Sequence, residues 1–178
     1  IYDIPKKKLR GSIGIVLQDT VIFNDTIMQN IRYGRLDATD EEVIAAAKTA
    51  KVADFAEKMA DGYDTMLTEG GGNLSQGQRQ LIAIARAVLA DPKILILDEA
   101  TSSIDTRTEV HIQEAMLALM KGRTSLIIAH RLSTIRDADK IVVIDGGKVV
   151  EAGNHEKLLS ENGAYARLYN TQFAGIKT

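Results

Sequence analysis

Two hydrophobic patterns alternate along the chain. Residues 13–17, 94–97 and 124–129 are short apolar runs of strand length, whereas residues 81–89 carry apolar side chains at helical spacing. Strands that alternate with helices of this length predict an α/β fold with a largely parallel sheet flanked by helices. The continuous apolar run at 94–97 also predicts a strand buried on both faces of that sheet.

Capping residues mark where three of the predicted helices begin. Thr39 and Glu42 have the spacing of a capping box, which predicts a helix over residues 39–48. Ser75 and Gln78 repeat this spacing before a helix that the Asp-Pro pair at 91–92 ends. Asp105 can cap a further helix. The predicted inner face of that helix consists of Ile112, Ala115, Met116 and Leu119.

The remaining segments complete the expected architecture. Residues 52–59 are a further helical stretch, and residues 141–151 are a hairpin around an Asp-Gly-Gly turn. Residues 1–10 are interpreted as the remnant of a strand with an unpaired edge, which is an aggregation hazard. We expect one domain, in which 1–18 and 91–178 form the α/β core and about 25–90 form a helical subdomain.

The composition narrows the class of protein. The formal net charge of −2 over 178 residues gives no support for a nucleic-acid partner held by bulk electrostatics, and none is expected. The chain has no cysteine, which excludes disulfides and thiolate metal sites. No apolar run approaches the roughly 18 residues of a membrane span. Because the chain begins with Ile1 in a segment that is patterned like a folded one, we interpret it as a piece of a longer protein.

Polar residues follow the three apolar runs: Gln18, then Asp98 with Glu99, then His130. If the strands are neighbours, these side chains converge at the carboxyl edge of the sheet, where open parallel sheets bind ligands. One carboxylate can hold Mg²⁺ and a second can orient or deprotonate a water molecule. The amide can contact both, and the imidazole can stabilise a phosphate. The alternative is that each is an ordinary polar loop residue.

The segment Leu74–Gln80, "LSQGQRQ", adds a possible anion site. A helix N-terminus with a hydroxyl and free N–H groups binds anions readily, and Gly77 lets the backbone approach a neighbouring group closely. The alternative reading is an ordinary capped helix after the glycine loop at 70–72.

Together these motifs resemble the nucleotide-binding domain of ATP-binding cassette (ABC) transporters, which has a P-loop NTPase-like fold with a helical subdomain. "LSQGQRQ" is similar to the family signature, "ILILDEAT" at 94–101 to the Walker B strand, and "SSID" at 102–105 to the D-loop. Gln18 matches the Q-loop and His130 the H-loop. Gln76 departs from the pattern, because the family usually has glycine there.

The resemblance implies ATP and Mg²⁺ as cofactors. It implies that Asp98 binds Mg²⁺ through water, that Gln18 senses metal and attacking water, and that Glu99 is the general base. His130 would contact the γ-phosphate. The resemblance further implies contacts across a head-to-tail dimer with a second nucleotide-binding domain. The residues it places there are Ser75, Gly77 and Gln78 on the ATP of the opposite subunit, with Asp105 at the dimer interface.

Residues 16–34 and 62–80 resemble bacterial multidrug exporters in particular. This implies an ATPase at the cytoplasmic face of the cell membrane that drives export through a membrane domain. The segment after Gln18 and the glycine loop before Leu74 would then face the coupling helices of that domain. The phosphate-binding motif G-x-x-x-x-G-K-[ST] does not occur in this chain, and Gly175–Thr178 lacks its spacing. We therefore expect the isolated chain to be inactive and of marginal stability.

Two other functions are compatible with the motifs. Soluble ABC-type ATPases of chromosome maintenance or translation share the signature and the acidic strand end, but they usually carry coiled-coil insertions or tandem cassettes. A non-catalytic binding or regulatory module is the third possibility. Six membrane spans encoded upstream would favour the exporter.

Overall fold

The computed structural model describes residues 3–17, 19–98, 104–129 and 132–173. The chain divides into two compact units, residues 1–128 and 129–178. The first unit contains a parallel three-stranded sheet in the order β1-β2-β3, formed by Ile13–Val16, Ile94–Asp98 and Thr124–Ile128. The prediction of an α/β fold with a parallel sheet flanked by helices is confirmed.

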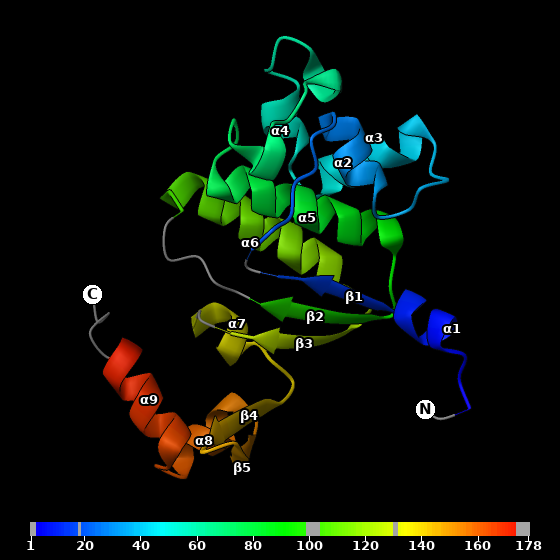
Figure 1. The fold of residues 1–178 in the computed structure, drawn as a ribbon. Helices are drawn as coiled ribbons and strands as arrows, with labels where there is room; N and C mark the ends of the chain where they lie inside the picture. The colour runs from blue at the N-terminus through cyan, green and yellow to red at the C-terminus, as the bar shows by residue number, and fades with distance from the viewer. Residues whose placement is uncertain (1–2, 18, 99–103, 130–131, 174–178) are drawn as a thin grey trace. The chain divides into compact units, whose positions relative to one another are not determined.

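Helices form two layers on one face of this sheet (Figure 1). The inner layer consists of α5 (Gln76–Ala90) and α6 (Thr106–Met120). The outer layer contains α2 (Ile27–Arg32), α3 (Asp40–Thr49) and α4 (Ala53–Ala56), with 3₁₀ turns η1 (Gly62–Asp64) and η2 (Glu69–Gly71). The core between the layers is one continuous cluster that runs from Leu95 and Leu97 of the sheet to Val43 of α3.

The predicted helix boundaries agree with the observed caps. The capping boxes of Thr39 with Glu42 and of Ser75 with Gln78 are both formed. The predicted inner face of α6 is buried as expected, at Ile112, Ala115, Met116 and Leu119. The helix predicted over 52–59 is shorter than expected and spans only Ala53–Ala56.

Two expectations about the sheet region are wrong. Residues 1–10 do not contain a described strand; instead α1 spans Lys6–Gly11, where Pro5 precedes lysines, leucine and arginine that favour a helix. The strand at 94–98 is buried on one face only. Leu95 and Leu97 are fully buried under α5 and α6, whereas Ile94 on the other face is 39% exposed. Ile15 and Leu126, the cross-strand partners of Ile96 on that same face, are 57% and 64% exposed. Among the described residues of this unit, helices cover only the first of these faces.

The second unit is built on an antiparallel hairpin of β4 (Ile141–Asp145) and β5 (Lys148–Gly153), as predicted. Its turn residues Gly146 and Gly147 have φ of 54° and 74°, the left-handed conformation that tight hairpins require. The structure adds helices that the sequence analysis does not predict: α7 (Leu132–Arg136), α8 (His155–Ser160) and α9 (Ala164–Phe173). Leu158 and Tyr165 from α8 and α9 pack with Val143 of the hairpin.

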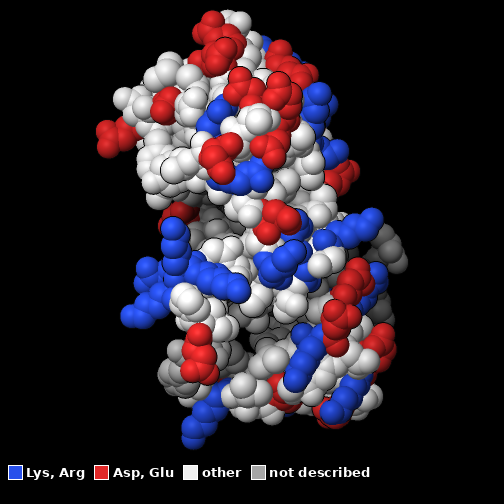
Figure 2. Space-filling model, turned by 90° about the vertical axis from the view of Figure 1, so that its right-hand side faces the viewer, with Lys and Arg blue, Asp and Glu red and all other residues white. Residues whose placement is uncertain are grey.

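Acidic and basic side chains are interspersed over the face shown in Figure 2. The ion pairs of the helical layer include Arg32 with Asp40 and Arg35 with Glu42. Within the described residues, no helix combines the length and the apolar character needed to cross a bilayer.

Candidate functional site

The carboxyl ends of the three parallel strands lie at one edge of the sheet. Val16 of β1 is in register with Leu97 of β2, and Asp98 of β2 is in register with Ile128 of β3. Asp98, the last residue of β2, is half-buried at this edge. The neighbour relation that the predicted polar cluster requires is therefore present for the strands themselves.

Three of the predicted site residues lie outside the described residues: Gln18, Glu99 and His130. Each follows the end of one of the three strands within two residues along the chain. Their roles therefore stay predictions from the sequence, while the strand ends that carry them are described.

The serine turn, defined here as Leu74–Gln78, opens helix α5. The Ser75 hydroxyl oxygen accepts from the backbone N–H of Gln78 at 3.2 Å, and the Ser75 backbone N–H donates to the side-chain oxygen of Gln78 at 2.9 Å. The capping box leaves the backbone N–H groups of Gln76 and Gly77 without an intrahelical acceptor, since they belong to the first turn. The turn can thus offer N–H groups and the Ser75 hydroxyl hydrogen to an anion.

Asp105 occupies the equivalent position at the start of α6. Its carboxylate accepts from the backbone N–H of Thr108 at 3.0 Å, and this hydrogen bond is the main cause that lowers the pKa of Asp105. The first turns of α5 and α6 lie at the same end of the unit as the carboxyl ends of the strands (Figure 1). A Cβ on Gly77 would lie only 3.2 Å from the Ile104 side chain, so the serine turn and the start of α6 are in direct contact.

The described residues contain no cluster of three or more His, Asp or Glu side chains that could hold a metal ion by itself. Mg²⁺ commonly takes one or two carboxylates from a protein and completes its shell with water and phosphate oxygens. Asp98, the last residue of β2 at the carboxyl edge of the sheet, is a described carboxylate that could supply such a ligand.

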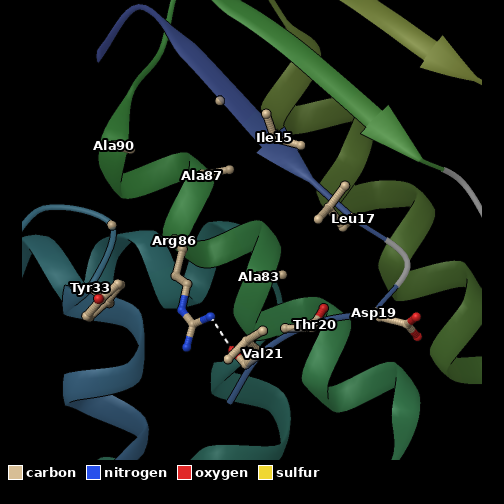
Figure 3. A pocket seen from close by; sticks show the side chains of 12 residues that line it. Ile15, Leu17, Asp19, Thr20, Val21, Tyr33, Ala83, Arg86, Ala87 and Ala90 are labelled. Carbon is tan, nitrogen blue, oxygen red and sulfur yellow. Dashed lines mark hydrogen bonds between the residues drawn. The ribbon is translucent and has the colours of Figure 1, made fainter. Parts of the chain in front are cut away.

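A hollow of about 270 Å³ lies between strand β1, the end of α2 and helix α5 (Figure 3). The sequence analysis did not identify this hollow. Strand β1 and the segment that follows it form one wall, and Tyr33, Gly34 and α5 form the other. Its lining residues include Val21, Tyr33, Gly34 and Arg86.

Arg86 hydrogen-bonds to both of the segments that lie beside this hollow, the one after β1 and α2. Its guanidinium donates to the backbone oxygens of Val21 and Asn30, both at 2.6 Å, and to Asn30 Oδ1 at 2.7 Å (Figure 3). It also lies 5.3 Å from the centroid of the Phe23 ring, which in turn stacks on Tyr33 at 4.4 Å. Burial lowers the pKa of Arg86, but a guanidinium remains charged in proteins.

Asn30 is the buried partner that holds the segment after β1 in place. It is 1% exposed, and its amide nitrogen donates to the backbone oxygens of Phe23, Asp25 and Thr26 at 3.0–3.2 Å. Its Oδ1 accepts from the Phe23 backbone N–H at 2.9 Å. Such a fully bonded buried amide fixes a loop, because breaking any of these bonds leaves a desolvated polar group.

The glycine loop before the serine turn is braced in a similar way. Arg79 of α5 donates to the backbone oxygens of Leu74 and Gly71, at 2.8 and 3.3 Å. The Asn73 amide donates to the Met66 backbone oxygen at 3.0 Å. Side chains of α5 therefore position both segments that the sequence analysis assigns to contacts with a partner domain.

Comparison with known proteins identifies this arrangement. The model of the family described as "ABC transporter" matches residues 1–102. The ABC transporter ATP-binding protein YfiC of Bacillus subtilis, which is described as uncharacterized, is 59% identical over 97% of this chain. The ATP-dependent lipid A-core flippase 1 of Colwellia psychrerythraea is 55% identical over 94% of the chain. A bacterial Atm1-family ABC exporter with ATP bound has a TM-score of 0.88 at 48% identity, over all of this chain and 31% of that one.

The chain therefore belongs to the ABC transporter family, and its fold is that of an ABC exporter nucleotide-binding domain. This confirms the resemblance that the motifs indicate. The chain spans 29% of the length of YfiC and 28% of the length of the flippase.

Proposed function

We propose that this chain is part of the nucleotide-binding domain of an ABC exporter, which binds and hydrolyses ATP to drive transport through a membrane domain. The observation that carries the proposal is the meeting of three parallel strand ends with the capped serine turn in one compact unit. The relatives are transporter proteins, so the alternative of a chromosome or translation ATPase is not favoured.

In this proposal the strand ends carry the chemistry. Asp98 would hold Mg²⁺ through water, and the ion when bound would offset the charge of the ATP phosphates. Glu99 would accept the proton of the attacking water, Gln18 would orient that water, and His130 would donate a hydrogen bond to the terminal phosphate. These roles rest on the family resemblance of the sequence positions.

The second half of the site would come from another copy or a related subunit. Ser75, Gly77 and Gln78 would present their hydroxyl, N–H groups and side-chain amide to the nucleotide of the partner domain. Asp105, beside this turn, would lie at the same interface. The Gln78 side-chain oxygen accepts from the Ser75 N–H, and its NH₂ group is the donor that it can present to a phosphate.

The hollow beside Tyr33 would receive a coupling helix of the membrane domain. Tyr33 is 59% exposed while its backbone is fixed through Gly34, whose Cα lies so close to α5 that a Cβ would be 2.3 Å from the Arg86 carbonyl oxygen. An exposed aromatic ring on a rigid frame is a suitable anchor for a helix, since little conformational entropy is lost on contact.

The proposal is tested on the full-length exporter in membranes. Glu99→Gln is expected to lower the ATPase rate by about 100-fold or more, which is the usual contribution of a general base. The matched control is Glu161→Gln, which alters an exposed carboxylate paired with Lys157 on α8 and should leave the rate unchanged. Wild-type turnover in Glu99→Gln would contradict the assigned base, and absence of ATPase in the wild type would contradict the proposed function.

A further inference from the structure

Gly77 is buried at the second position of α5, where it faces another helix of the same chain. A Cβ at this position would lie 2.3 Å from Thr108 Cγ2 and 3.2 Å from Ile104 Cγ2. Ordinary contacts of a Cβ begin at 3.4 Å, so a methyl group at position 77 would force the two helix ends apart by about 1 Å. The space in front of Gly77 is thus occupied by α6.

Thr108 cannot easily turn its methyl group away. The carboxylate of Asp105 accepts a hydrogen bond from the backbone N–H of Thr108 at 3.0 Å, which fixes the backbone of this first turn. Because a β-branched side chain has few rotamers in a helix, the methyl group of Thr108 stays close to Gly77. The cap of α6 and the packing against α5 therefore depend on the same residue.

We propose that Gly77 is required because of Thr108, and that their contact is a positioning device that holds the serine turn in fixed relation to Asp105. It rests on the proposed function, in which the serine turn and Asp105 both act at the dimer interface. Without this contact, glycine would be a poor choice, because alanine is the better helix former. In this inference, a residue without a side chain is needed at position 77 for the packing of α5 against α6, and not for the approach of the nucleotide.

The test is a double-mutant cycle in the full-length exporter. Gly77→Ala is expected to lower the melting temperature and to lower kcat for ATP by about 100-fold, the cost that a displacement of about 1 Å can have. Thr108→Ser removes the methyl group, keeps the hydroxyl and the backbone N–H bond to Asp105, and should behave like the wild type. The double variant is expected to recover both the melting temperature and at least about tenfold in kcat.

Thr108→Val is the matched control for the rescue. It keeps a branched side chain of the same size and loses the hydroxyl, so it should not rescue Gly77→Ala. The inference is overturned if Gly77→Ala keeps the wild-type melting temperature, loses kcat and is not rescued by Thr108→Ser, because the added methyl group would then meet the nucleotide. If even the wild type lacks ATPase activity, the proposed function fails. The melting temperatures of the four proteins in the cycle would still show whether the methyl group of Thr108 is what excludes a side chain at position 77.

Discussion

Arg86 is expected to be the most important polar side chain for the stability of the first unit. The change to test is Arg86→Met, which keeps the length of the side chain and removes the guanidinium. Three hydrogen bonds of 2.6–2.7 Å are lost with it, together with the contact to the Phe23 ring. The carbonyl oxygens of Val21 and Asn30 lose a charged donor at the same time.

The magnitude follows from these contacts. A hydrogen bond to a charged group contributes about 1.5–3 kcal/mol, but bonds made by one side chain are not additive. Because Arg86 is only partly buried, some acceptors can be rehydrated after the change, so we expect a loss of about 3–4 kcal/mol rather than the full sum. That is a large share of the roughly 5–15 kcal/mol of net stability of a typical domain.

The assay is urea unfolding of the purified chain, followed by far-UV circular dichroism. Arg35→Met is the matched control, because Arg35 pairs with Glu42 on the exposed surface of the same layer. A cycle with Asn30→Ala adds a second criterion: the losses from Arg86→Met and Asn30→Ala should sum to clearly more than the loss in the double variant, since the two residues share bonds. A loss of stability from Arg86→Met no larger than that from Arg35→Met, or an additive cycle, would contradict this role of Arg86.

Two further predictions concern the proposed partner surface and the second unit. The chain has no cysteine, so Tyr33→Cys introduces a single thiol that should form a disulfide with a cysteine placed on a coupling helix of the membrane domain, whereas the equally exposed Leu117→Cys on α6 should not. Equal cross-linking at both positions would argue against docking at the hollow. Glu151 accepts from the backbone N–H groups of Tyr165 and Ala164, and these bonds lower its pKa below 4.5. The stabilising effect of ionised Glu151 is therefore present above that pH and lost as the pH falls through the lowered pKa. Glu151→Gln should destabilise α9 at pH 7 and make its unfolding less sensitive to acid. An unchanged pH dependence of unfolding would contradict this.

Local signals predicted much of this fold. The capping boxes at Thr39 and Ser75, the Asp105 cap and the Gly146-Gly147 turn each depend on residues within a few positions of one another. Local features of this kind form wherever the backbone adopts the turn, so they can be predicted from the sequence alone. The alternation of apolar runs with helical periodicity likewise predicted the parallel sheet.

Local sequence signals did not predict the structure correctly where they were weak or where packing with distant segments was decisive. The sequence analysis places no individual helix at residues 27–32, yet α2 forms there, and its Asn30 is bonded to Arg86, 56 residues away. Residues 1–10 were expected to be the remnant of an edge strand, but Lys6–Gly11 form α1, in agreement with their own helix propensity. The sheet was expected to be covered on both faces, but only the face under α5 and α6 is covered within the described residues.

Neighbouring residues along the chain specify the caps, the turns and the apolar alternation, and the motifs indicated the family. The contacts of each side chain became known only from the folded chain. The tertiary structure showed that the neighbour in front of Gly77 is Thr108, and that Arg86 holds the segment after β1. The physical reason is that capping and periodicity are properties of adjacent residues, whereas steric fit and buried hydrogen bonding depend on distant segments that only the folded chain brings together.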